Sequence, residues 1–264
     1  MKTHQAAQLN DVERQAAHFE NIAGTYYVSR SNASHLAFKD VLWKKFFDRN
    51  APFFSKSKRK VLEPMCGYGE GRKIIGAHLG GLFSYTGFDI STEMIKKARQ
   101  DYPADNMFNQ DITTYEPHDE YDILVIIGGL HHVYRHTEHV LKILYKSAAR
   151  GGLFINFEPT HNNRVIGKIR QHIYNRNSFF DTDTEQGFEL NTLNNSVVAA
   201  GFTLIDQIYP GLLAYILYYN PDAFPKLLKG GPGFARLFSI AESFFWTSYA
   251  AKKLSFATIS LWRK

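Results

Sequence analysis

The sequence predicts an α/β fold in which helices cover both faces of a doubly wound, mostly parallel sheet. Residues 60–90 read as a strand, a glycine loop, a helix and a second strand that ends in an acid. Residues 121–127 form a continuous apolar run, which is typical of the buried centre of a parallel sheet. Residues 151–159 repeat the order of glycine turn, apolar strand and polar end. Strands of this kind bring their polar carboxyl ends to one edge, where such sheets bind ligands.

The first of these segments predicts a site for an adenosine derivative. The strand that ends near Glu63 leads into Gly67, Gly69 and Gly71, and glycines at this point let the backbone approach a ligand closely. Asp89 ends the next strand about twenty residues later, where a carboxylate can accept two hydrogen bonds from ribose hydroxyls.

Glu63 and the glycine spacing indicate which derivative. Dinucleotide sites use G-x-G-x-x-G and a helix N-terminus that faces a pyrophosphate, whereas here the spacing is G-x-G-x-G and a carboxylate that would repel an anion precedes it. S-adenosylmethionine (SAM) has no phosphate and carries two cationic groups, so it suits this loop. The chain at this point resembles the class I SAM-dependent methyltransferases, whose first motif reads (D/E)-x-G-x-G-x-G. Met65 stands at the first glycine of that motif, as in a D-P-M-C-G run of RNA guanine methyltransferases, and is expected to line the pocket.

The resemblance implies roles for later positions and a seven-stranded Rossmann-like sheet. Ile90 is expected to pack on the adenine, with Met94 close by. Asp111 matches the family acid that accepts a hydrogen bond from the adenine amino group, although a turn or cap role is the alternative, and the Ile112 backbone can donate to the ring. Gly128 follows the fourth strand, beside the sulfonium in the family. The last, antiparallel strand is expected at residues 254–262.

Residues 1–50 are predicted to form an N-terminal helical cap. Apolar residues at helical spacing indicate helices at 12–23 and 35–47. Phe19, Ala23 and Tyr26 form an F-x-x-x-A-x-x-Y arrangement, which Tyr27 and Arg30 follow. This arrangement resembles the cap of small-molecule and quinone-type methyltransferases. There the tyrosine or arginine approaches the SAM carboxylate, a pairing that Arg30 could make as a charge-assisted fork. The alternative is a surface Arg30 and a packed Tyr27.

Residues 51–264 are predicted to form the SAM-binding core, with a helical insert at about 210–252. The insert includes an apolar helix at 234–246. Its aromatic residues fit protein core, a homodimer interface or a pocket for an apolar or ring-bearing acceptor. Binding to a membrane interface is disfavoured, because the apolar stretches lack a matching basic face.

Three histidines are candidates for the base that a hydroxyl acceptor requires. His131 and His132 follow the fourth strand, and His161 follows the fifth. Each has a side chain that titrates near neutral pH. Adjacent histidines are expected to face opposite ways, so at most one should reach the acceptor, and His132 is favoured over His161. The acids Asp181, Asp183 and Glu185 could hold a cation or an acceptor, but a helix cap near residues 190–200 is commoner, and no metal is predicted.

Composition favours one soluble, cytoplasmic chain. The net charge of +6 is spread along the sequence, and the only basic cluster, at residues 56–60, fits a solvated linker better than a nucleic-acid site. Cys66 is the single cysteine, which excludes an intrachain disulfide and favours a space-filling role. The sequence contains no run of 18 apolar residues, so a membrane-spanning helix is not expected. The N-terminus is polar, so a signal peptide is not expected either.

The function expected is a class I methyltransferase that acts on a small molecule, with oxygen ahead of nitrogen or carbon as the accepting atom. An RNA or DNA methyltransferase is one alternative, but base-amino enzymes carry N/D-P-P-Y after the fourth strand, where this chain has Gly-Gly-Leu-His-His from residue 128. A protein that binds SAM without transferring its methyl group is the other. The sequence does not identify the acceptor.

Overall fold

The computed structural model describes residues 11–55, 59–79, 83–176, 186–221 and 225–264. Its centre is one sheet with the strand order β3-β2-β1-β4-β5-β8-β7, and the short β6 pairs with β5. The strands from β1 to β5 pair in parallel, whereas β8 runs antiparallel to both β5 and β7. The predicted doubly wound, mostly parallel sheet is therefore confirmed. The strands are β1 (Arg59–Pro64), β2 (Phe83–Asp89), β3 (Asn106–Asn109), β4 (Tyr121–Ile127), β5 (Ala148–His161), β6 (Phe188–Glu189), β7 (Thr203–Ile208) and β8 (Ala257–Arg263).

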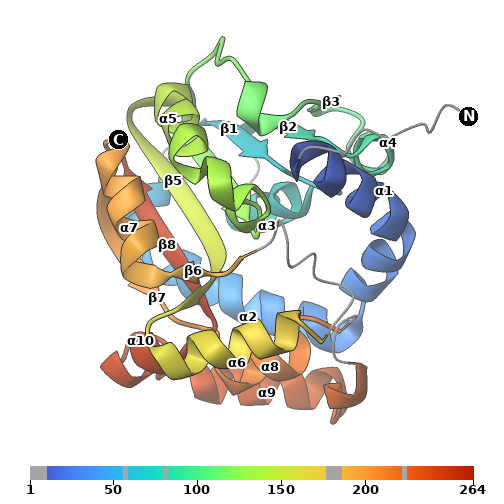
Figure 1. Ribbon diagram of the computed structural model, residues 1–264, viewed down its shortest axis with the longest axis vertical. Helices are drawn as coiled ribbons and strands as arrows, with labels where there is room; N and C mark the ends of the chain where they lie inside the picture. Colours follow the sequence, from blue (N-terminus) through green and yellow to red (C-terminus); the bar gives the residue numbers. More distant parts are fainter. Residues whose placement is uncertain (1–10, 56–58, 80–82, 177–185, 222–224) are drawn as a thin grey trace, which may run out of the picture.

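Helices cover both faces of this sheet, and a further group of helices lies at one end of the molecule. Figure 1 shows α1 at the right of the sheet, with α6, α8, α9 and α10 together at the lower end of the molecule. The α-helices are α1 (Asp11–Arg30), α2 (Ala33–Arg49), α3 (Glu70–His78), α4 (Thr92–Asp101), α5 (Thr137–Ser147), α6 (Arg164–Tyr174), α7 (Leu190–Ala199), α8 (Leu213–Tyr218), α9 (Gly231–Ser243) and α10 (Tyr249–Leu254). The short 3-10 helices are η1 (Ala51–Phe54), η2 (Ile112–Thr114), η3 (Leu130–His136) and η4 (Pro225–Leu227).

The apolar run of β4 supplies core residues to both faces. Ile123 and Val125 belong to the core that also contains α2, α3 and α8, whereas Leu124 and Ile126 belong to the core beneath α5 and α7. Successive side chains of a strand point to opposite faces, so a run that is apolar throughout requires helices on both sides.

The register of the parallel strands brings their carboxyl ends to one edge. Glu63 of β1 pairs with Gly87, and Asp89 of β2 pairs with Asn109. The last residue of β4, Ile127, pairs with Phe157, which precedes Glu158 in β5. The polar strand ends that the sequence singled out therefore gather where an open α/β sheet forms its ligand crevice.

Three expected boundaries are corrected. The first helix continues through Gly24 to Arg30 rather than ending at residue 23. A glycine inside a helix costs about 1 kcal/mol, and the packing of α1 against α4 and η3 offsets this cost. The insert helix is displaced towards the N-terminus, at Gly231–Ser243, and the last strand begins at Ala257.

Glu189 caps α7 by accepting from the Thr192 amide at 2.7 Å. The acidic loop predicted at residues 181–185 lies outside the described residues.

No helix in the described parts of the chain is long and apolar enough to cross a bilayer.

Candidate functional site

The loop after β1 is built from left-handed residues. Gly67 has a φ of 51° and Gly69 a φ of 79°, a region that glycine adopts without steric cost. Met65 has a φ of 58° and is the only non-glycine residue in the described chain with a positive φ. A side chain in this region costs roughly 1–2 kcal/mol, so the motif's usual glycine is the unstrained choice. The expectation that Met65 lines a pocket is met, because its side chain forms part of the cavity described below.

Glu63 holds the other end of this loop. Its buried carboxylate accepts hydrogen bonds from the amides of Gly71 at 2.9 Å and Arg72 at 3.1 Å, and the Tyr85 hydroxyl also donates to it. Burial raises the pKa of Glu63 to about 8, against the effect of these donors. The sequence argument placed a carboxylate charge opposite the cations of SAM, but Glu63 is largely protonated at neutral pH and directed at the start of α3. Its clearest contribution is to fix the loop.

Asp89 connects the same loop to the helix that follows β2. One carboxylate oxygen accepts from the Gly67 amide at 2.9 Å, and the other accepts from the Ser91 amide at 2.9 Å. Burial raises the pKa of Asp89, and both amide bonds oppose that rise. Ser91 in turn caps α4 by accepting from the Met94 amide at 3.3 Å. Because each carboxylate oxygen can accept a second hydrogen bond, Asp89 retains the capacity to bind two ribose hydroxyls.

Asp111 has the local role that was the alternative at the sequence level. It caps η2 and accepts from the amide and from the hydroxyl of Thr113, both at 2.8 Å. Asp111 and Ile112 nevertheless line the cavity, together with Gln110. A cap role and an adenine contact are compatible, since each carboxylate oxygen keeps a free lone pair.

One cavity of about 420 Å³ lies at the carboxyl ends of the strands, with walls from α1, α2, α3 and the strand-end loops. Sites for ligands of cofactor size measure roughly 300–1,000 Å³. It brings together thirteen of the residues predicted from the sequence: Tyr27, Arg30, Glu63, Met65, Gly67, Gly69, Asp89, Ile90, Met94, Asp111, Ile112, Gly128 and His132. It also has lining residues that sequence reasoning did not assign, notably Leu36, Lys39 and Trp43 of α2. Nothing in the local sequence of α2 distinguishes these from core residues.

The three candidate histidines occupy different environments. His132 lines the cavity, and the edge of its ring meets the Phe19 ring of α1 with centroids 4.8 Å apart. His131 is not among the lining residues, and its Nδ1 lies 2.9 Å from a carboxylate oxygen of Glu158. The centroids of the two histidine rings are 3.9 Å apart, so the expectation that these side chains face opposite ways is wrong. Side chains alternate in this way along a strand, but both histidines lie in the 3-10 helix η3.

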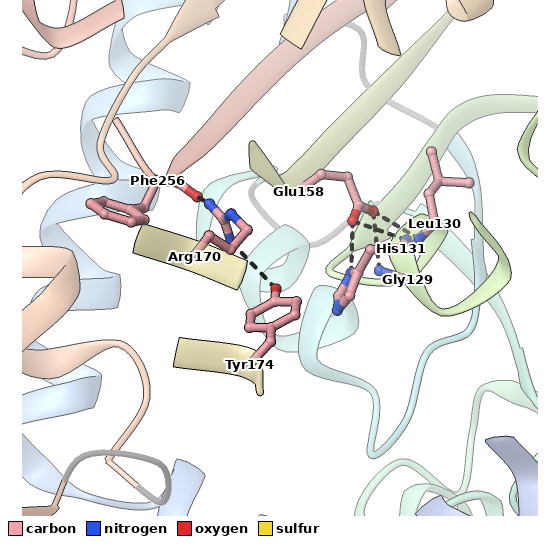
Figure 2. A network of polar contacts seen from close by, with 7 residues as sticks. All are labelled: Gly129, Leu130, His131, Glu158, Arg170, Tyr174 and Phe256. Atoms are coloured by element: carbon pink, nitrogen blue, oxygen red, sulfur yellow. Dashed lines mark hydrogen bonds and ion pairs between the residues drawn. The ribbon is translucent and has the colours of Figure 1, made fainter. Parts of the chain in front are cut away.

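Glu158 helps to build the site, although the sequence assigned it no role beyond the polar end of the fifth strand. Its buried carboxylate accepts from the amides of Gly129 at 3.1 Å, Leu130 at 2.8 Å and His131 at 3.4 Å, as Figure 2 shows. Burial raises its pKa to about 7, while the amide donors and the electrostatic influence of His132 lower it. Glu158 therefore fixes the turn after β4 that carries Gly128 and the two histidines.

His161 lies away from the cavity lining. Burial and the nearby charge of Arg170 lower its pKa. Arg170 is buried and donates to the Thr160 carbonyl oxygen at 2.7 Å. It also donates to the Phe256 carbonyl oxygen and to the Tyr174 hydroxyl at 3.3 Å, as Figure 2 shows. These bonds join α6 to the residues around β8, so the surroundings of His161 are structural.

Arg30 connects the cap to the insert as well as lining the cavity. Its Nη1 donates to the Tyr219 carbonyl at 2.6 Å, and its guanidinium lies over the Tyr26 ring at 4.6 Å. The expected pairing with a SAM carboxylate stays a prediction. Lys39 and Glu70 form an ion pair in the same wall, between α2 and the start of α3.

The strand order, the glycine loop and the acids at the strand ends define a class I SAM-dependent methyltransferase fold. Residues 62–154 match the family model described as a methyltransferase domain, so the predicted resemblance and the predicted cofactor, SAM, are confirmed at the level of the family.

Solved structures show the same fold at low sequence identity. A complex between the Trm112 methyltransferase activator and a methyltransferase from Haloferax volcanii matches with a TM-score of 0.60 and 15% identity, covering 94% of this chain and 96% of that one. A protein described as a sarcosine dimethylglycine methyltransferase from Galdieria sulphuraria matches with a TM-score of 0.59 and 14% identity, over 86% and 85% of the two chains. The [4+2]-cyclase SpnF matches with a TM-score of 0.56 and 15% identity, over 82% and 81%. Among curated proteins, none matches this chain.

Proposed function

We propose that the protein transfers the methyl group of SAM to a hydroxyl of a small molecule, of an apolar or ring-bearing kind such as a natural product, a sugar or a quinone-like compound. The supporting observation is that a single cavity is lined by Gly67, Asp89 and Asp111, by His132, and by aromatic residues of the cap such as Phe19. A donor and an acceptor in this cavity lie next to each other. Since methyl transfer is an in-line displacement, holding the two together supplies much of the catalysis.

The proposed cofactor contacts follow the strand ends. Asp89 binds the ribose hydroxyls, Asp111 and Ile112 bind the adenine edge, and Gly128 lies beside the sulfonium. Asp89 and Asp111 already have one partner on each carboxylate oxygen and so are held in place before the ligand arrives. A site whose acceptors are preorganised loses less free energy to ordering when it binds.

His132 is the proposed base. It is the one of the three candidate histidines that lines the cavity, and both Asp89 and Glu158 interact with it electrostatically. Nearby carboxylates favour the protonated imidazole, so they stabilise the imidazolium that forms when a hydroxyl proton is taken. His131, bound to Glu158, positions the turn without reaching the acceptor.

The acceptor end of the cavity is assigned to the cap. Phe19, Tyr26, Tyr27 and Trp43 are lining residues from α1 and α2, and aromatic rings of this kind bind apolar or ring-bearing molecules. Closure of α1 over the strand ends also excludes water, which strengthens electrostatic interactions inside the site.

The cofactor assignment is tested by calorimetric titration with S-adenosylhomocysteine, NAD and ATP in parallel. Selective binding of S-adenosylhomocysteine is expected. A preference for NAD would refute the assignment. Labelled SAM is then offered with a panel of hydroxyl, amine and carbon acceptors, and transfer to a hydroxyl compound is the expected result.

The base is tested by comparing His132→Ala with His161→Ala as a matched control. General-base catalysis contributes about 10²–10⁴-fold, so His132→Ala should lower kcat by that factor and leave the affinity for S-adenosylhomocysteine nearly unchanged. His161→Ala should retain near-normal kcat. Equal losses in the two variants would remove His132 from the mechanism.

Binding of SAM without methyl transfer is the second candidate. It is favoured by one observation, the shared fold with a protein described as a [4+2]-cyclase. Tight binding of S-adenosylhomocysteine with no transfer to any acceptor class would support this candidate instead.

A further inference from the structure

Helix α9 buries its small residues and exposes its large ones. Ala235, Ser239 and Ser243 are buried on the side that packs against α2. The hydroxyls of the two serines donate to carbonyl oxygens within the helix, at 2.6 Å to Ala235 and 2.7 Å to Ile240. Small residues allow α9 to lie close to α2. Of the larger apolar side chains of α9, Phe238 packs against the core, whereas Phe234, Leu237 and Ile240 stay exposed.

Those larger side chains form an exposed apolar face. Phe234 is 54% exposed, Leu237 70% and Phe244 75%, and their helical spacing places them on one side of α9. We define the apolar face as these three residues together with Ile240, Phe245 and Tyr249, all of them exposed. Figure 1 shows α9 at the lower rim of the molecule with α10 beside it. Single exposed apolar residues are ordinary, but a contiguous set of large ones indicates a binding surface.

Lysines lie at the edges of this face. The ammonium of Lys45, from α2, lies 5.6 Å from the centre of the Phe244 ring, and that of Lys253, from α10, lies 5.5 Å from the centre of the Tyr249 ring. The sequence argument against membrane binding looked for cations within the apolar stretches themselves. The structure corrects it, because the cations come from neighbouring helices.

The acids near the apolar face are either turned inward or paired with a cation. Residues 225–264 contain seven lysines and arginines and one acid, Glu242. Glu242 points inward, where its carboxylate accepts from the Ala214 amide at 3.0 Å and the Trp246 indole at 3.1 Å. On α2, Asp40 pairs with Arg236 of α9, and Asp48 pairs with Lys44. Lys45 and Lys253 add to these pairs, so the charge around the apolar face is net cationic.

We propose that the apolar face of α9 docks the protein on an anionic lipid bilayer. Phenylalanine and leucine side chains partition into the interfacial region of a bilayer, while flanking lysines reach anionic headgroups, and each contributes to binding. A second copy of the chain fits this surface less well. A two-fold contact would place the face against itself and bring Lys45 and Lys253 towards their own copies, while the nearby acids Asp40 and Asp48 already pair with Arg236 and Lys44.

The docking surface is separate from the cavity. Helix α2 lies between them, since it packs against α9 and also supplies Leu36, Lys39 and Trp43 to the cavity wall. Lipid binding therefore goes beyond the proposed function and can be tested without an acceptor.

The test is flotation of the full-length protein with two kinds of vesicle. Neutral vesicles contain phosphatidylcholine alone, and anionic vesicles contain phosphatidylglycerol as a minor component. The protein is expected to float with the anionic vesicles and to be released by high salt, which screens the lysines. Leu237→Ser/Phe244→Ser should lower the bound fraction at least about tenfold, because two large apolar groups are lost. Lys45→Gln/Lys253→Gln should weaken binding to the anionic vesicles only.

A matched control uses exposed apolar residues elsewhere. Val198→Ser/Leu204→Ser changes two apolar side chains on α7 and β7, which are 56% and 41% exposed, and should leave flotation unchanged. Titration with S-adenosylhomocysteine shows that each variant is folded and tests the proposed function separately. Failure of the unaltered protein to float would overturn the proposal. So would a dimer in gel filtration that Leu237→Ser/Phe244→Ser converts to a monomer without any change in vesicle binding, since a second copy would then cover the face.

Discussion

The substitution Gly71→Ala tests the geometry of the loop that the cavity depends on. Gly71 is the second residue of α3, and a Cβ atom there would lie 2.5 Å from the carboxyl group of Glu63. Glu63 cannot move aside freely, because its carboxylate is bonded to the amides of Gly71 and Arg72 and to the Tyr85 hydroxyl. The added methyl group must displace either the buried carboxylate or the start of α3.

The expected cost follows from these contacts. Overpacking of a buried site costs about 1–3 kcal/mol, and amides that lose a buried acceptor cost about 1–3 kcal/mol each. The preference of a helix for alanine over glycine returns about 1 kcal/mol. We expect the free energy of unfolding to fall by about 2–4 kcal/mol, which for a chain of this size is a loss of roughly 4–8 °C in Tm.

Gly24→Ala is the matched control. Gly24 also lies in a helix, but nothing lies within 4 Å of a Cβ built there. Helix propensity alone then applies, and Gly24→Ala should raise the free energy of unfolding by about 0.5–1 kcal/mol. Urea denaturation followed by circular dichroism measures both variants. If Gly71→Ala proves as stable as the unaltered protein, the carboxylate of Glu63 does not lie against α3 and the account of the loop is refuted.

Two further predictions concern buried carboxylates. Asp89→Ala should weaken binding of S-adenosylhomocysteine by about 1–3 kcal/mol, because ribose hydroxyls and the Gly67 amide lose their acceptor, and unchanged affinity in calorimetry would contradict the site. Burial raises the pKa of Glu63 to about 8 and of Glu158 to about 7 from an ordinary value of 4.5, so the folded state keeps protons that the unfolded chain releases. The stability that these two protonated carboxyl groups contribute is fully present below pH 4.5 and is lost as the pH rises through 7–8. Tm should therefore decline between pH 4.5 and 8, and it should decline less in Glu158→Gln.

The sequence predicted the strand-end wall of the cavity because its determinants are local. Glycines with a forced backbone conformation and an acid at the end of each strand lie within one crossover unit, so Gly67 and Asp89 can be recognised without knowing the tertiary structure. Glu158 was missed because its role depends on pairing between β4 and β5. Its bonds to the turn after β4 join residues that are 27–29 positions apart. The apolar strand that precedes it gave no signal that this particular polar residue faces three amides.

The cap shows the limit of local reasoning more clearly. Glu20 of α1 accepts from the Thr92 amide at 2.5 Å, across 72 positions, and Arg30 binds the Tyr219 carbonyl, across 189 positions. No motif indicates either pairing, since the arrangement that includes Arg30 suggested a SAM carboxylate and not the Tyr219 carbonyl. The spacing of apolar residues therefore predicted two helices, but could not say that the first extends to Arg30 or which surfaces it joins.

The two walls of the cavity consequently differ in how they are held. The strand-end wall is fixed by buried carboxylates, Glu63 and Glu158, each of which accepts from amides at the start of a helical segment. Such bonds are strong where water is excluded. In the cap wall, the polar contacts of α1 at Glu20 and Arg30 are exposed or only partly buried and contribute much less, whereas α2 is held by buried side chains such as Trp43. Distance along the chain explains the pattern of the predictions. The local geometry of the glycine loop could be predicted from the sequence, whereas the pairings of Glu158, Glu20 and Arg30 join distant positions and could not.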